Sequence, residues 1–158
     1  MHFLRHYSLF VVSLYERHKS FFTVEGKVDN TILIDDSEID LFIQRRFLEV
    51  YAFTRNIITY KSAQEALDAL QQPNTTIPDI IFLDLNMPNV DGFGFLKNLH
   101  SLAPAVQENT RIIVLTSSNN KKDKDEAFKY KNVVHYITKP IKQSDIEHLK
   151  EMLFRKSA

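Results

Sequence analysis

The stretch at residues 79–88, DIIFLDLNMP, decides the fold of this chain, because an apolar run leads without interruption into a charged residue. A short run of this kind predicts a strand covered on both faces, as the central strands of parallel sheets are. Asp84 ends the run. An unpaired charge in such a buried place is costly, so we expect Asp84 to have partners nearby.

Three other apolar runs also stop at a polar or charged residue. They are Thr31–Asp35, which Asp36 follows, Arg111–Leu115, which Thr116 follows, and Val133–Ile137, which lies just before Lys139. Open parallel sheets bind ligands beyond the carboxyl ends of their strands. We therefore expect three carboxylates, a hydroxyl and an ammonium to form one phosphate site at that edge.

From residue 31 onward, short apolar runs alternate with longer amphipathic ones, which is typical of an α/β domain built around a parallel sheet. The pattern predicts five pairs of strand and helix. The predicted strands are Thr31–Asp35, Asn56–Tyr60, Asp79–Asp84, Arg111–Leu115 and Val133–Ile137, and the helices are Ser37–Tyr51, Ser62–Gln71, Phe93–Leu102, Lys121–Lys131 and Ser144–Arg155.

Residue types add two details to these helices. Ser37 is suited to cap the first helix, and apolar residues at helical spacing predict its buried face, namely Ile39, Phe42, Ile43, Phe47 and Val50. Asn132 lies where the fourth helix must stop, and Asn tolerates the left-handed backbone that such a stop often needs.

The composition excludes several classes of protein. The chain has 158 residues, enough for one domain with a full core, and its 20 Lys and Arg balance its 20 Asp and Glu. This balance gives no reason to expect nucleic acid or an anionic membrane as partner. The absence of cysteine excludes a disulfide framework, a thiolate zinc site and a cysteine nucleophile. No apolar stretch approaches the roughly 20 residues that cross a bilayer, so we expect a cytoplasmic protein.

Residues 1–28 do not share the alternating pattern. The segment is rich in aromatic residues and shows no clean period. Three interpretations stay open: an added element that packs on the domain, an arm that binds a partner, or a stretch outside the functional product. We favour a dispensable N-terminal extension, with the domain itself at residues 29–158.

The expected site suits phosphoryl transfer to a carboxylate. Such a transfer needs cations, because the moving group carries negative charge on its oxygens. Mg²⁺ prefers oxygen ligands, and the sequence offers three carboxylates and a backbone carbonyl: Asp35, Asp36, Asp84 and that of Asn86. Lys139 can offset further charge, and Thr116 adds a hydroxyl donor.

Each of these residues also has an ordinary interpretation. Asp35 and Asp36 alone are more often a capping pair before a helix than metal ligands. Thr116 alone suits a helix cap, and Lys139 alone suits a solvated loop. Their joint placement at the end of strands on one edge argues for the site.

From Asn30 to Lys156, the chain resembles the receiver domain of two-component response regulators. The resemblance rests on Asp35-Asp36, Asp84, Thr116 and Lys139-Pro140. It implies a flavodoxin-like, doubly wound five-stranded parallel sheet of order 2-1-3-4-5 with five helices. The chain departs from the family before the fifth strand, where a glycine is usual and Asn132 or Val133 stands.

The resemblance also implies roles for single residues. Asp84 matches the phosphoacceptor, Asp35 and Asp36 the acidic pair that holds Mg²⁺, Thr116 the switch hydroxyl, Lys139 the lysine of the site, and Tyr136 the switch aromatic. The implied partners are a histidine kinase or histidine phosphotransfer protein and a downstream target protein, with dimerisation as an option. Fewer than twenty residues follow Lys139, so we expect a single-domain regulator that binds no nucleic acid or membrane.

Two other functions remain as alternatives. An aspartyl-phosphate phosphotransferase would need a second acid two residues after Asp84, where Asn86 stands. A degenerate receiver would act as an interaction domain without phosphorylation, although the acidic and basic positions are intact. We expect a phosphoacceptor that is not an enzyme, with at most slow loss of its own phosphoryl group.

Overall fold

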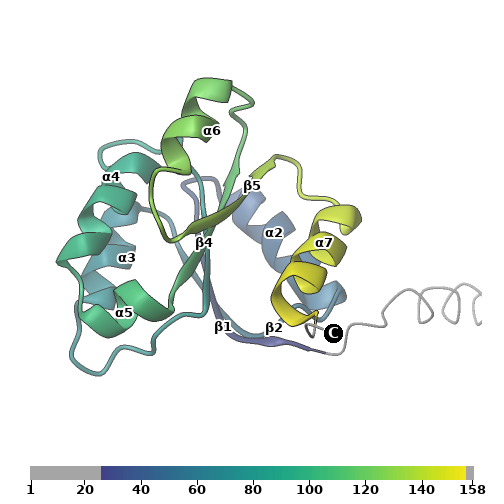
Figure 1. The fold of residues 1–158 in the computed structure, drawn as a ribbon, viewed down its shortest axis with the longest axis horizontal. Coiled ribbons are helices and arrows are strands. Elements are labelled where there is room, and N and C mark those ends of the chain that lie inside the picture. The colour runs from purple at the N-terminus through teal and green to yellow at the C-terminus, as the bar shows by residue number, and fades with distance from the viewer. Residues whose placement is uncertain (1–25, 156–158) are drawn as a thin grey trace, which may run out of the picture. The chain divides into compact units, whose positions relative to one another are not determined.

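Five parallel strands lie in the order β2-β1-β3-β4-β5 (Figure 1). The computed structural model describes residues 26–155, and Lys27–Ile146 forms one compact unit that contains the whole sheet. The strands are β1 Val28–Ile34, β2 Thr54–Tyr60, β3 Ile80–Leu83, β4 Arg111–Thr116 and β5 Val133–Thr138. The predicted doubly wound, flavodoxin-like sheet and its strand order are therefore confirmed.

The described residues contain six α-helices, where the sequence predicted five. They are α2 Glu38–Val50, α3 Ala63–Leu70, α4 Gly92–Asn98, α5 Pro104–Asn109, α6 Lys121–Ala127 and α7 Gln143–Phe154, and a 3₁₀ turn at Leu99–Ser101 follows α4. The additional helix, α5, begins at Pro104, whose fixed φ suits a first helical turn. It is too short to show a hydrophobic period, which explains why the sequence did not predict it. None of the helices between residues 26 and 155 is long and apolar enough to span a membrane.

β3 is the central strand, and all four of its residues are buried, as predicted. Ile81 and Leu83 face a hydrophobic cluster that α3, α4 and α5 complete with Leu67, Phe95 and Val106. Helix α2 lies against the opposite face of the sheet, beside β1 and β2 (Figure 1). Cover on both faces explains why this strand reads as a continuous apolar run.

The predicted buried face of α2 was wrong. The buried residues are Leu41, Gln44 and Leu48, whereas Ile39 is 72% exposed and Phe42 is 66% exposed. Both sets of residues fit the helical period, and helical spacing with hydrophobicity alone favours the more apolar set as the buried face. The true inward face has a glutamine at its centre, which only tertiary contacts explain.

Asn132 does not adopt the left-handed backbone that the sequence suggested. Among the described residues other than glycine, only Ala52 and Asn89 have a positive φ. Asn132 is buried instead, and its side-chain amide donates hydrogen bonds to the carbonyls of Gln107, at 2.7 Å, and Thr110, at 2.8 Å. The Asn132 side chain therefore connects the end of α5 to the turn before β5.

Candidate functional site

The predicted site residues lie at one edge of the sheet. Asp35 follows β1 and Asp84 follows β3, and the pairing of Ile34 with Leu83 brings the two acids side by side. Thr116 ends β4, where it pairs with the last residue of β5, next to Lys139. The parallel register thus gathers residues that are far apart in the sequence.

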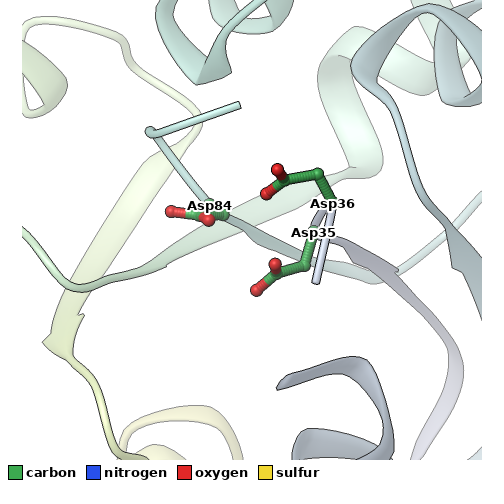
Figure 2. Close-up of side chains that lie close together, drawn as sticks. All are labelled: Asp35, Asp36 and Asp84. Atoms are coloured by element: carbon green, nitrogen blue, oxygen red, sulfur yellow. The ribbon is translucent and has the colours of Figure 1, made fainter. Parts of the chain in front are cut away.

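Three carboxylates form a compact acidic cluster. Carboxylate oxygens of Asp35, Asp36 and Asp84 lie within 4.8 Å of one another (Figure 2). Asp35 and Asp84 are buried, and Asp36 is exposed. Carboxylate oxygens are the ligands that Mg²⁺ prefers, and one acid open to solvent leaves room for the water that this ion usually keeps. The donor set therefore fits a hard divalent cation.

Asp35 accepts three hydrogen bonds, two from the start and the inward face of α2 and one from the segment after β5. Its Oδ1 accepts from the backbone N–H of Ser37 at 2.9 Å. Its Oδ2 accepts from Nε2 of Gln44 at 2.9 Å and from Nζ of Lys139 at 2.7 Å. Ser37 also caps α2, as predicted, because its Oγ accepts from the backbone N–H of Asp40 at 3.2 Å.

Lys139 is the cation at the centre of the site. Its Nζ lies 2.7 Å from Oδ2 of Asp35, 2.9 Å from Oδ2 of Asp40 and 3.3 Å from Oδ2 of Asp84. Burial disfavours the charged ammonium, but the hydrogen bonds that it donates to Asp35 and Asp40 and the negative charge of Asp84 outweigh the burial and raise the pKa of Lys139. The side chain is therefore charged at neutral pH and offsets part of the negative charge of the three acids.

Asp84 is buried, and its burial outweighs the neighbouring groups that favour its charge. Burial raises its pKa, and the nearby charge of Asp35 adds to this. The backbone N–H of Asn86, 3.1 Å from Oδ1, and the Lys139 ammonium act in the opposite direction without cancelling the rise. The first of these bonds places the Asn86 backbone, whose carbonyl was predicted as a ligand, directly beside Asp84.

Thr116 and Tyr136 are buried residues of β4 and β5, the two strands beside the acidic cluster. Thr116 is fully buried, and its Oγ1 accepts a hydrogen bond from Nδ2 of Asn86 at 3.3 Å. Tyr136 is 9% exposed, and its hydroxyl donates to the carbonyl of Ser118 at 2.9 Å. Burial raises the pKa of Tyr136. The aromatic ring therefore already points inward and is tied to the loop that follows Thr116.

Sequence reasoning missed two residues of the site, Asp40 and Gln44. Both lie on α2 and contact the predicted residues directly. A signal for each exists in the sequence. Gln44 interrupts the spacing of Leu41 and Leu48, and Asp40 stands one helical turn after the acidic pair.

A surface hollow of about 290 Å³ opens beside the site, between α2 and the segment after β5. Asp40, Ile43, Lys139 and Ile141 are among the residues that line it. Next to it, the outer face of α2 exposes Ile39, Phe42 and Ile43. Charged and apolar groups are thus available together at this corner of the domain.

The chain is similar to solved structures of response regulators. A response regulator receiver protein from Dyadobacter fermentans has 30% identity and a TM-score of 0.70, with 82% of this chain and 99% of that chain covered. The Mn(2+)-bound form of response regulator Rcp1 has 26% identity and a TM-score of 0.63, with coverages of 82% and 96%.

A curated relative is much longer than the matched region. Over 109 residues, the chain is 29% identical to protein-glutamate methylesterase/protein-glutamine glutaminase 5 of Myxococcus xanthus. The matched region covers 69% of this chain but only 29% of that protein. The chain thus spans less than a third of that relative. Residues 31–151 match the family model of the response regulator receiver domain, and the chain therefore belongs to that family.

Proposed function

We propose that residues 29–158 act as a phosphoacceptor response regulator, in which Asp84 takes a phosphoryl group from a histidine kinase or histidine phosphotransfer protein. One observation carries this proposal. A buried carboxylate, two further acids and a charged lysine meet at the end of the central strand. This is the arrangement that a carboxylate needs in order to receive an anionic group.

The transfer is a substitution at phosphorus. An oxygen of the Asp84 carboxylate forms a bond to phosphorus, the bond from phosphorus to the donor's histidine nitrogen breaks, and the electron pair stays on that nitrogen. Bound Mg²⁺ would offset the negative charge of the phosphoryl oxygens. Asp35, Asp36, Asp84 and the carbonyl of Asn86 would hold it, and the Mn(2+)-bound relative supports a cation there. Lys139 supplies the second positive charge.

We further propose that Thr116 and Tyr136 transmit the change. A phosphoryl group adds strong acceptor oxygens, toward which the Thr116 hydroxyl can turn once it leaves the Asn86 amide. Tyr136 is bonded to Ser118, two residues after Thr116, so a shift of this loop alters the surface of α6 and β5. Phosphorylation would then shift the balance between two states and change the contacts with a target protein.

The outer face of α2 supports a protein as phosphodonor. Ile39, Phe42 and Ile43 are exposed beside the hollow that leads to Lys139. Apolar side chains gathered at the surface mark interaction sites, and a helical partner can bury such a face. A cytoplasmic location follows from the proposed partners.

The test is incubation of the purified protein with acetyl phosphate and Mg²⁺, followed by intact mass measurement. We expect the addition of one phosphoryl group that hydroxylamine removes and that Asp84→Asn abolishes. Asp79→Asn is the matched control, because Asp79 precedes the same strand and lies at its other end. Lasting modification supports the proposal. Repeated turnover would favour the phosphotransferase, and no reaction would favour the degenerate receiver.

A further inference from the structure

We propose that Asp40 is a positioning residue that holds the Lys139 ammonium on α2 and thereby limits how readily Lys139 reaches a phosphoryl group on Asp84. This inference rests on the function proposed above. It concerns a residue of the first turn of α2 that touches none of the reacting atoms. Asp40 acts through its contact with Lys139.

The geometry shows that Lys139 is shared among three acids. An ammonium has three N–H donors, and three carboxylate oxygens surround this one. The contacts to Asp35, at 2.7 Å, and Asp40, at 2.9 Å, are shorter than the contact to Asp84, at 3.3 Å. In the unphosphorylated protein the ammonium is therefore held more closely by the first loop and α2 than by the phosphoacceptor.

Asp40 is the partner that Lys139 can leave at the lowest cost. The side chain of Asp35 is 1% exposed, so loss of the ammonium would leave a buried carboxylate with hydrogen bonds from neutral groups but without its cationic partner. The side chain of Asp40 is 38% exposed and borders the open hollow, so water can replace the ammonium there. A phosphoryl oxygen thus competes chiefly with Asp40 for Lys139.

The competition predicts a faster reaction when Asp40 loses its charge. With acetyl phosphate, an Asp84 oxygen bonds to phosphorus, the bond from phosphorus to the acetate oxygen breaks, and acetate leaves with the electron pair. Lys139 must follow the phosphoryl oxygens during this step. Asp40→Asn weakens the competing contact, so we expect the rate of phosphorylation to rise about two- to fivefold, the range that one partly exposed ion pair contributes.

The test compares rates of phosphoryl uptake from acetyl phosphate, measured by intact mass, first in the four proteins of a double-mutant cycle. They are wild type, Asp40→Asn, Lys139→Ala and the double variant. Glu38→Gln is the matched control, because it removes the same charge from the same helical turn but contacts Lys61 instead of Lys139. Asp40→Glu restores a carboxylate and is expected to return the rate toward that of wild type. Urea unfolding of the same four proteins gives a second readout, the coupling between the two side chains in the absence of any phosphodonor.

We expect Asp40→Asn to accelerate uptake only where Lys139 is present, and the unfolding data to show coupling between the two residues. Equal acceleration by Asp40→Asn and Glu38→Gln would overturn the proposal, because it would reduce the effect to general charge. If Lys139→Ala does not fold, the comparison of Asp40→Asn with Glu38→Gln and the rate of Asp40→Glu test the proposal instead. Failure of wild type to take up any phosphoryl group would overturn the proposed function and the role of Asp40 together. Normal uptake that Asp40→Asn leaves unchanged would overturn the role of Asp40 alone.

Discussion

Replacement of Gln44 by Leu tests whether the inward face of α2 holds the acidic site in place. Gln44 is 4% exposed, and its Nε2 donates at 2.9 Å to Asp35, whose side chain is itself buried. A hydrogen bond to a charged group contributes about 1.5 to 3 kcal/mol. Leu has a similar size and recovers part of this by burying apolar surface. We therefore expect a net loss of roughly 1 to 2 kcal/mol in the free energy of unfolding.

At about 4 °C per kcal/mol for a domain of this size, the loss lowers Tm by about 4 to 8 °C. Urea and thermal unfolding without divalent cations measure both quantities. Gln64→Leu is the matched control, because Gln64 also donates to a carboxylate, that of Asp68 at 2.8 Å, but on an exposed helix surface. The reasoning would be refuted if Gln44→Leu changed the unfolding free energy by less than about 0.5 kcal/mol, the range of ordinary surface substitutions. An equal loss in Gln64→Leu would refute it as well.

Three further predictions concern charge, docking and the turn before β5. Burial raises the pKa of Asp84 above its usual 3.8, so without cations Asp84→Asn should be more stable than wild type at pH 7, and unfolding at several pH values should show this advantage vanish as the pH falls below about 3.8. Phe42→Asp should slow transfer from a phosphorylated histidine phosphotransfer protein by about thirtyfold or more, the scale of an interface hot spot, while acetyl phosphate still reacts normally. Val50→Asp, at the far end of α2, is its control, and equal slowing in both would contradict the docking face. Asn132→Ala removes one buried and one partly buried hydrogen bond and should lower the free energy of unfolding, measured in urea, by about 1 to 3 kcal/mol. Asn109→Ala loses one exposed hydrogen bond of 2.7 Å and should lower it much less.

The sheet could be predicted because each of its strands is marked by a local pattern in the sequence. Each strand is a short apolar run, and the residue that ends the run marks the edge where a parallel sheet places its ligands. Asp84 and Lys139 were found in this way, although they are 55 positions apart in the sequence. Neither prediction needed knowledge of which helix covers which face.

The faces of α2 were not predictable by the same means. Phe42 and Leu41 are neighbours in the chain, and helical spacing alone allows either to face the sheet. The choice depends on Gln44. Its side chain turns inward because its amide donates a hydrogen bond to Asp35, which also accepts one from Lys139. The contribution of Asp40 is hidden for the same reason, because only the fold brings Lys139 to it.

Under the proposed function, the two faces of α2 would divide the chemistry of the site from the recognition of a partner within one helix. Leu41, Gln44 and Leu48 point inward, while Ile39 and Phe42 point to solvent. Substitutions on the outer side can thus accumulate without disturbing the acids beneath. If the outer face binds the phosphodonor as proposed, a duplicated copy of this domain could acquire a new donor through a few surface substitutions and keep the acidic cluster unchanged.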